Sequence, residues 1–203
     1  MDSNLHFWQR NAKHYTAIQE ASNRALYDQV IARCRPYLSP DSRVLELACG
    51  TGQFTFPLCE GSALWEATDF SPEMIRQAQS RNDSCARFSV EDATDLSFPE
   101  NSFDVVLIAN ALHILPEPEI ALAEIRRVLA PGGILLAPTF VYEGKRNRLR
   151  LWIMERAGFR TFHKWTCQGL REFLEKAGFR VLELERIQGK LLPEAFAAAE
   201  PKL

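Results

Sequence analysis

The fold is decided by one stretch of the sequence, Val44-Leu45-Glu46-Leu47-Ala48-Cys49-Gly50-Thr51-Gly52. It begins as a short apolar strand, passes an acidic residue and breaks into a glycine-rich turn, and a helix is expected to follow from about Phe54. A strand that runs into such a turn at the start of a helix is how α/β proteins bring backbone N–H groups close to a nucleotide-like ligand. We therefore expect Gly50 and Gly52 to let the backbone approach a ligand. Glu46, near the end of the strand, is expected to face a cationic group of that ligand.

Apolar runs alternate with helical stripes on both sides of this stretch. Residues 5–38 are predicted to be helical, and the buried stripe of this region is expected to hold Tyr27, Val30, Ile31 and Cys34. The expected strands are 43–47, 63–69, 87–91, 103–110, 134–140, 180–188 and 191–200, and the expected helices are 53–60, 71–81, 118–130 and two segments with apolar stripes at 149–157 and 170–177. This order predicts an α/β fold: a Rossmann-like, doubly wound sheet of seven mostly parallel strands with an antiparallel last strand, and an N-terminal helical lid. Such sheets bind ligands beyond the carboxyl ends of their strands.

Local signals set several boundaries. Ser71 is expected to cap the N-terminus of a helix whose first residue is Pro72. The Pro-Gly-Gly sequence at 131–133 is expected to stop the helix that precedes the fifth strand. Gly158 and Gly178, each followed by Phe-Arg, are expected to end the two C-terminal helices.

Composition narrows the classes of protein. The chain of 203 residues is expected to form one domain with a single core. A net charge of −2 gives no reason to expect a nucleic-acid partner. The five cysteines are odd in number, scattered and without a CxxC pair, which argues against a disulfide framework and a metal site and fits a reducing compartment. Because the first residues lack the apolar core of a signal peptide and no apolar run reaches the roughly 20 residues of a membrane span, we expect a cytoplasmic protein.

Three further motifs follow the first in order. They are Ala67-Thr68-Asp69-Phe70-Ser71-Pro72-Glu73-Met74, Val90-Glu91-Asp92-Ala93-Thr94, and the apolar run from Phe103 that continues into Asn110-Ala111-Leu112-His113. Together with the first turn, they resemble the motifs of class I S-adenosylmethionine (SAM)-dependent methyltransferases, and in particular the UbiE-like group, which acts on small molecules. The resemblance covers roughly residues 40–140 and implies SAM as the cofactor. It divides the chain into a lid (1–38), a SAM-binding half (40–140) and a substrate-side half (141–203).

The resemblance assigns roles to residues along the SAM-binding half. Asp69, which follows Gly52 by 17 residues, is expected to accept hydrogen bonds from both ribose hydroxyls, as the acid about 20 residues beyond a glycine-rich turn does in related folds. Asp92 is expected to accept from the adenine amino group, although Glu91 competes for that role. The other expected contacts are Phe70 and Met74 packed against adenine, the Ala93 N–H on a ring nitrogen, Asn110 beside the amino-acid end of SAM, and Glu46, Ala48, Gly50 and Gly52 around that end.

One departure concerns Ala48, where many members of the group have glycine. An alanine costs little there if its φ is negative, but a positive φ would strain the turn.

The chemistry explains why the acceptor is harder to identify than the cofactor. SAM is already activated, so positioning and exclusion of water supply most of the catalysis, and a base is needed only when the acceptor must lose a proton. His113 is the sharpest candidate base, with local packing as its alternative reading. Trp8, His14, Tyr15, Tyr142 and His163 are candidate substrate contacts. The surrounding aromatics favour an apolar or aromatic small-molecule acceptor, or a cationic amine held against ring faces.

Rival interpretations fit less well. A nicotinamide-dependent dehydrogenase would need a small residue at the third glycine position, where Thr55 stands, and no GxxxxGK[ST] phosphate loop is present. A noncatalytic SAM-binding regulatory or assembly protein remains the alternative. Contact of the basic segment 145–150 with an anionic membrane is considered but not favoured over a solvated helix start. Oligomeric state and the acceptor atom stay open.

Overall fold

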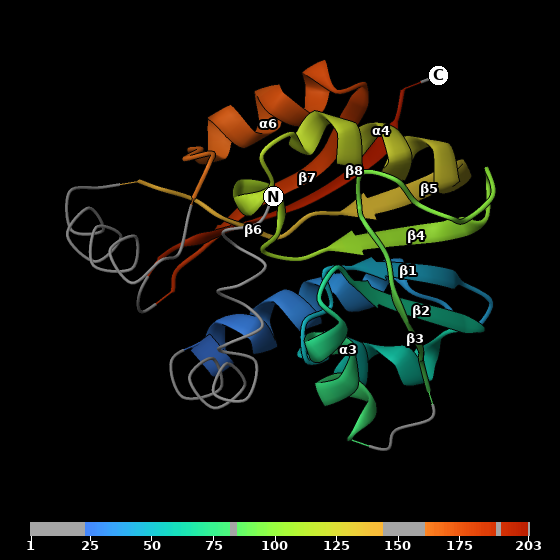
Figure 1. The fold of residues 1–203 in the computed structure, drawn as a ribbon. Helices are drawn as coiled ribbons and strands as arrows, with labels where there is room; N and C mark the ends of the chain where they lie inside the picture. Colours follow the sequence, from blue (N-terminus) through green and yellow to red (C-terminus); the bar gives the residue numbers. More distant parts are fainter. Residues whose placement is uncertain (1–22, 82–84, 144–160, 190–191, 203) are drawn as a thin grey trace.

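A computed structural model describes residues 23–81, 85–143, 161–189 and 192–202 (Figure 1). Among the described residues, eight strands form one sheet in the order β3-β2-β1-β4-β5-β8, and β6 and β7 both pair with β8. Strands β1 to β5 pair in parallel where they are neighbours, while β8 runs antiparallel to both β5 and β7. The strands are β1 (Arg43–Leu47), β2 (Leu64–Asp69), β3 (Arg87–Val90), β4 (Phe103–Ile108), β5 (Leu129–Leu136), β6 (Thr139–Phe140), β7 (Phe179–Ile187) and β8 (Glu194–Pro201). The predicted fold class is confirmed.

The additional strand, β6, continues β5 along the same partner strand, β8. Leu136 of β5 pairs with Ala198, and Thr139 of β6 pairs with Ala195, so both segments keep one register along β8. Pro138 lies between them, and a proline has no N–H to donate to a sheet. The single predicted strand at 134–140 is therefore interrupted at its middle, which accounts for the difference between seven and eight strands.

Helices cover both faces of the sheet. Alternate residues of a strand point to opposite faces, so Leu45 and Val106 pack with α4 and α6 whereas Val44 and Val105 pack with the helix at 23–34. Figure 1 shows the two layers, with α4 and α6 above the sheet and helix 23–34 and α3 below it. The helical elements are 23–34, η1 (Arg35–Tyr37), α2 (Thr55–Leu58), η2 (Cys59–Gly61), α3 (Pro72–Gln79), η3 (Leu112–Ile114), α4 (Pro118–Val128) and α6 (Cys167–Lys176).

Several local predictions are confirmed and one boundary is wrong. Ser71 caps α3 by accepting a hydrogen bond from the Met74 N–H, and Gly178 follows α6 with a φ of 86°. The expected buried stripe of helix 23–34 is buried along its length. However, residues 131–133 do not precede the fifth strand but lie inside β5, where the pairing with β4 slips between Phe103 and Val105. Residues 5–22 and the stripe at 149–157 with Gly158 lie outside the described residues.

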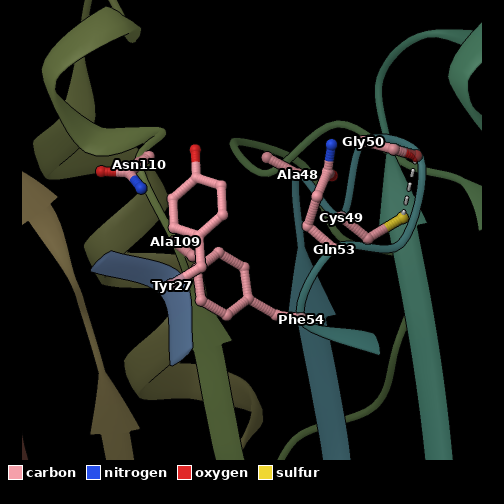
Figure 2. Close-up of a pocket in the computed structure, with 8 residues that line it drawn as sticks. All are labelled: Tyr27, Ala48, Cys49, Gly50, Gln53, Phe54, Ala109 and Asn110. Carbon is pink, nitrogen blue, oxygen red and sulfur yellow. Dashed lines mark hydrogen bonds between the residues drawn. The ribbon is translucent and has the colours of Figure 1, made fainter. Parts of the chain in front are cut away.

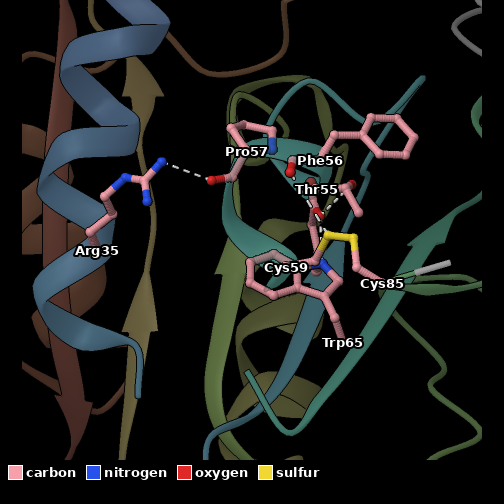
Figure 3. Close-up of a disulfide and its surroundings, with 8 residues drawn as sticks. Arg35, Thr55, Phe56, Pro57, Cys59, Trp65 and Cys85 are labelled. Atoms are coloured by element: carbon pink, nitrogen blue, oxygen red, sulfur yellow. Dashed lines mark hydrogen bonds between the residues drawn. A yellow bond between two sulfur atoms is a disulfide. The ribbon is translucent and has the colours of Figure 1, made fainter. Parts of the chain in front are cut away.

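The cysteine pattern argued against a disulfide framework, but the described residues contain one disulfide. Cys59, in η2, is joined to Cys85, which precedes β3, by a disulfide with a Cα–Cα distance of 5.6 Å (Figure 3). Sequence spacing could not reveal this pair, because the fold brings together two segments that are 26 residues apart. The argument for a reducing compartment therefore no longer holds. Within the described ranges, no helix combines the length and apolar character needed to cross a membrane.

Candidate functional site

The glycine-rich turn leaves the carboxyl end of β1 in a left-handed conformation. Ala48, Gly50 and Gly52 all have positive φ, at 55°, 58° and 87°. Such angles cost an alanine roughly 1–2 kcal/mol, so the backbone is strained at Ala48, as expected for an alanine with positive φ at this position. At Gly52 the φ of 87° is one that L side chains rarely adopt, and a Cβ atom would lie 2.3 Å from Cε2 of Phe56 unless that ring moved.

Asp69, at the end of β2, ties this turn to the start of α3. Its Oδ2 accepts from the Gly50 N–H at 2.9 Å, and its Oδ1 accepts from the Ser71 N–H at 2.8 Å. Burial raises the pKa of Asp69, and these two hydrogen bonds act in the opposite direction. A carboxylate has about four lone-pair positions, so about two remain for the pair of ribose hydroxyls that the sequence assigned to Asp69.

Glu46 lies beneath the turn, with 1% of its surface exposed. Thr55 Oγ1 and Trp65 Nε1 both donate to its Oε2, at 2.7 and 2.9 Å. Burial raises the pKa of Glu46 to about 7 despite these two bonds. Glu46 therefore organises the underside of the turn, and it would add negative charge there when ionised.

A pocket opens beside the turn, between the carboxyl ends of β1 and β4 (Figure 2). Its lining is Tyr27, Ala48, Cys49, Gly50, Gln53, Phe54, Ala109 and Asn110. Figure 2 shows Gln53 on the β1 side and Asn110 on the β4 side, with the ring of Tyr27 between them. The ring of Tyr27, from helix 23–34, contacts that of Phe54 edge-on with centroids 5.2 Å apart.

Two amide side chains of this pocket, those of Gln53 and Asn110, test whether the methionine end of SAM fits the pocket. Gln53 Nε2 and Asn110 Oδ1 are buried, and neither has a hydrogen-bond partner within the described part of the chain. Buried polar atoms normally have partners. A donor and an acceptor on opposite sides suit a carboxylate and an ammonium, so the lining fits an amino-acid group. Sequence reasoning named Asn110 but missed Tyr27, Gln53 and Phe54. The position of Gln53 directly after Gly52 was the available signal for it.

Asn110 also makes a contact that the sequence did not reveal. Its backbone has a φ of 54°, and its Nδ2 donates to Oε1 of Glu194 at 3.3 Å. Glu194 begins β8, has no exposed surface, and has its pKa raised to about 8 by burial. The one hint in the sequence was a single charge within the apolar run 191–199.

The residues assigned to adenine lie at the ends of β2 and β3. Phe70 is 41% exposed next to Asp69, whereas Met74 is buried on α3. Asp92 Oδ1 accepts from the N–H and the hydroxyl of Thr94, at 2.9 and 2.7 Å. Glu91 instead accepts from the N–H and the hydroxyl of Ser97, so its carboxylate is engaged elsewhere. Ala93, partly buried, packs against the core next to Asp92.

His113 lies in η3, with 2% of its surface exposed. Its ring contacts Phe140 and Tyr142 with centroid distances of 5.8 and 6.3 Å, and burial lowers its pKa to about 3. Its carbonyl oxygen accepts from the N–H groups of Phe162 and His163. The imidazole is therefore neutral near pH 7 and is a weak base.

The segment 161–165 is thereby held against η3. His163 stacks on Trp165 with centroids 5.0 Å apart, and Tyr142 donates its backbone N–H to the Trp165 carbonyl at 2.8 Å. The fold thus brings Tyr142, His163 and His113 together. The other predicted substrate contacts, Trp8, His14 and Tyr15, lie outside the described residues. In the part of the chain that is described, no cluster of three or more His, Cys, Asp or Glu could hold a metal ion.

Part of the chain is similar in sequence to known methyltransferases. Residues 45–137 match the family described as a methyltransferase domain. The demethylmenaquinone methyltransferase of Renibacterium salmoninarum is 41% identical over 101 residues, which are 50% of this chain and 42% of that protein. The enzyme of the same name from Clavibacter sepedonicus is 40% identical over 100 residues, or 48% of this chain and 41% of its own length. The chain therefore covers about two fifths of these relatives.

Two solved structures superpose over nearly the whole chain. A complex between the Haloferax volcanii Trm112 methyltransferase activator and a methyltransferase gives a TM-score of 0.83 at 21% identity, covering 97% of this chain and 98% of that one. The DhpI–SAH complex gives 0.81 at 22% identity, with 99% and 96% covered. At these identities the two structures establish the fold.

Proposed function

We propose that the protein transfers the methyl group of SAM to a small apolar or aromatic acceptor. The premise is that residues 45–137 are a methyltransferase domain of the class I, SAM-dependent type. The observation that carries this proposal is the pocket beside the left-handed turn. Two of its buried atoms, Gln53 Nε2 and Asn110 Oδ1, have no hydrogen-bond partner among the described residues, and they match the carboxylate and the ammonium at the methionine end of SAM.

The remaining groups extend the site along the carboxyl ends of the strands. Asp69 would take the ribose with the lone pairs that Gly50 and Ser71 leave free. Asp92 and the Ala93 N–H would take the adenine, since Thr94 bonds only Oδ1 of Asp92 whereas Ser97 bonds both carboxylate oxygens of Glu91. This direction, from β1 through β2 to β3, follows the order in which the three strands pair.

Catalysis by this chain would rest on positioning. When bound, SAM supplies the activated methyl group, and the protein has to hold the acceptor in line and exclude water. His113 is neutral and buried under Phe140 and Tyr142, so we assign it to shaping the acceptor side instead of removing a proton.

Aromatic side chains near η3 indicate the class of acceptor. Tyr142, Phe162 and His163 come together there, and Phe162 is 43% exposed. Exposed ring faces suit a flat or apolar acceptor. Relatives named demethylmenaquinone methyltransferases cover about half of this chain. A quinol-like ring is therefore the first acceptor to test, ahead of phenols and amines.

Isothermal titration calorimetry with SAM, and separately with NAD, tests the cofactor. We expect SAM to bind at micromolar affinity and NAD to give no heat. Gln53→Ala should weaken SAM binding about tenfold or more, because the carboxylate loses a buried donor, whereas Gln168→Ala, on the exposed side of α6, should not. Transfer of a labelled methyl group to a quinol would then support catalysis, while tight SAM binding without turnover across the acceptor panel would favour a noncatalytic SAM-binding protein.

A further inference from the structure

Glu194 is a buried carboxyl group that the proposed methyl transfer leaves without a role. It has no exposed surface, and its register neighbours on β6 and β7 are the uncharged Phe140 and Ile187. Within the described residues, burial and the hydrogen bond from Asn110 are the influences on its pKa, no cation is among them, and its Oε2 has no hydrogen-bond partner. A buried carboxylate with so little compensation is costly when ionised.

Among the described residues, the side-chain hydrogen bond of Glu194 joins it to a residue of the pocket. Asn110 Nδ2 donates to Glu194 Oε1 at 3.3 Å, and Asn110 is a lining residue on the β4 side. Cys34, on helix 23–34, is a titratable group near Glu194. The pKa of its thiol is raised mainly by burial, and the negative charge of Glu194 raises it further. The negative charge of Glu46, on β1, also raises the pKa of Cys34. Burial raises the pKa of Glu194 to about 8, so the group is mostly protonated near neutral pH before a ligand binds.

A positively charged ligand in the pocket would change that balance. SAM has two positive groups, an ammonium and a sulfonium, and one carboxylate. Its demethylated product, S-adenosylhomocysteine (SAH), lacks the sulfonium charge. A nearby cation favours the ionised form of a carboxyl group, and a medium of low dielectric strengthens the effect. The Asn110 amide lines the pocket and donates through Nδ2 to Glu194, so it connects the carboxyl group to the pocket.

We propose that Glu194 ionises when the methionine end of SAM enters the pocket, so that SAM binding releases a proton to solvent and Glu194, acting through Asn110, favours the charged cofactor over SAH. Glu194 is a positioning residue here, since Asn110 is the group that lines the pocket. The inference rests on the proposed SAM site and adds a mechanism by which that site distinguishes the cofactor from the spent product.

The expected effect has a definite sign. Because a proton leaves on binding, SAM affinity rises with pH. Each unit by which bound SAM lowers the pKa of Glu194 adds about tenfold to the affinity between about pH 6 and about pH 9. The pH dependence for SAH should be smaller, because its charge at sulfur is absent.

The test is calorimetry in buffers of different ionisation enthalpy, which counts the protons released when SAM or SAH binds. Glu194→Gln is expected to release fewer protons than wild type with SAM, and to differ less from wild type with SAH. Glu200→Gln is the matched control, because Glu200 lies on the same strand in a surface ion pair with Arg180. Glu46 also titrates near this range, with a pKa of about 7, so the difference between wild type and Glu194→Gln carries the result.

A second variant guards against a purely structural effect. Asn110→Gly keeps the left-handed backbone but removes the amide. In that background, Glu194→Gln should change SAM affinity less than it does in wild type, with thermal unfolding used to check that each variant folds. Equal proton release by wild type and Glu194→Gln would overturn the inference while leaving the cofactor assignment intact. Absence of SAM binding at every pH would overturn both.

Discussion

Asp69→Asn is the substitution that most directly tests how the site holds its cofactor. The Asp69 carboxylate accepts the N–H groups of Gly50 and Ser71, one at each oxygen. Asparagine keeps the shape but replaces one acceptor oxygen with a donor. In the variant, one backbone N–H would face an NH₂ group, and only one side-chain oxygen would be left for the ribose.

The expected loss is larger for binding than for folding. A hydrogen bond to a charged group contributes about 1.5–3 kcal/mol, so losing one ribose contact should weaken SAM binding about ten- to a hundredfold. Stability should change by only about 1 kcal/mol, since the lost backbone contact is offset by removing a carboxylate whose pKa burial raises.

Calorimetry with SAM measures the loss of binding, and urea unfolding measures the change in stability. Asp104→Asn is a suitable control, because Asp104 binds Arg43 at the opposite end of the sheet. An Asp69→Asn variant that binds SAM as tightly as wild type would refute the assignment of Asp69 to the ribose. A large loss of stability with unchanged affinity would mean that Asp69 serves the turn alone.

Three further changes test the buried acids, the strained turn and the disulfide. Burial raises the pKa of Glu194 from 4.5 to about 8, so the favourable contribution of its protonated form is complete below about pH 4.5 and is lost as pH rises through about 8. The unfolding free energy measured with urea between about pH 5 and about pH 9 should decline, with at most about 5 kcal/mol of the decline due to Glu194 and absent from Glu194→Gln, and parallel profiles for the two proteins would contradict the burial argument. Ala48→Gly should stabilise the fold by about 0.5–1 kcal/mol, because glycine tolerates the φ of 55°; Ala63→Gly, which is outside the left-handed positions, should destabilise it, and a loss at both sites would show that Ala48 is not strained. Cys85→Ser opens a bridge between residues 26 apart and should lower the unfolding free energy by about 3 kcal/mol under oxidising conditions, with Cys167→Ser, at a free thiol, as the control; equal midpoints with and without reductant would argue against the bridge.

Local features of the site were predictable from the sequence because their cause is local. Gly52 is favoured by a turn with a φ of 87°, and Ser71 caps a helix that begins at the next residue. The family match over residues 45–137 confirms the resemblance drawn from those motifs. The start of the fifth strand was placed wrongly, since Pro-Gly-Gly normally ends an element and only the pairing with β4 extends β5 across it.

What the sequence by itself determined is the α/β fold and the identity of the glycine-rich turn with its acid at the end of β2, because strand periodicity and turn chemistry act over a few residues. The tertiary structure alone decided that Glu194 meets Asn110, 84 residues away, and that Cys59 meets Cys85. It also decided that Tyr27 covers the pocket and that burial leaves His113 neutral. These contacts and the resulting pKa values depend on which strands become neighbours and how much water they exclude. No spacing along the chain encodes those two properties.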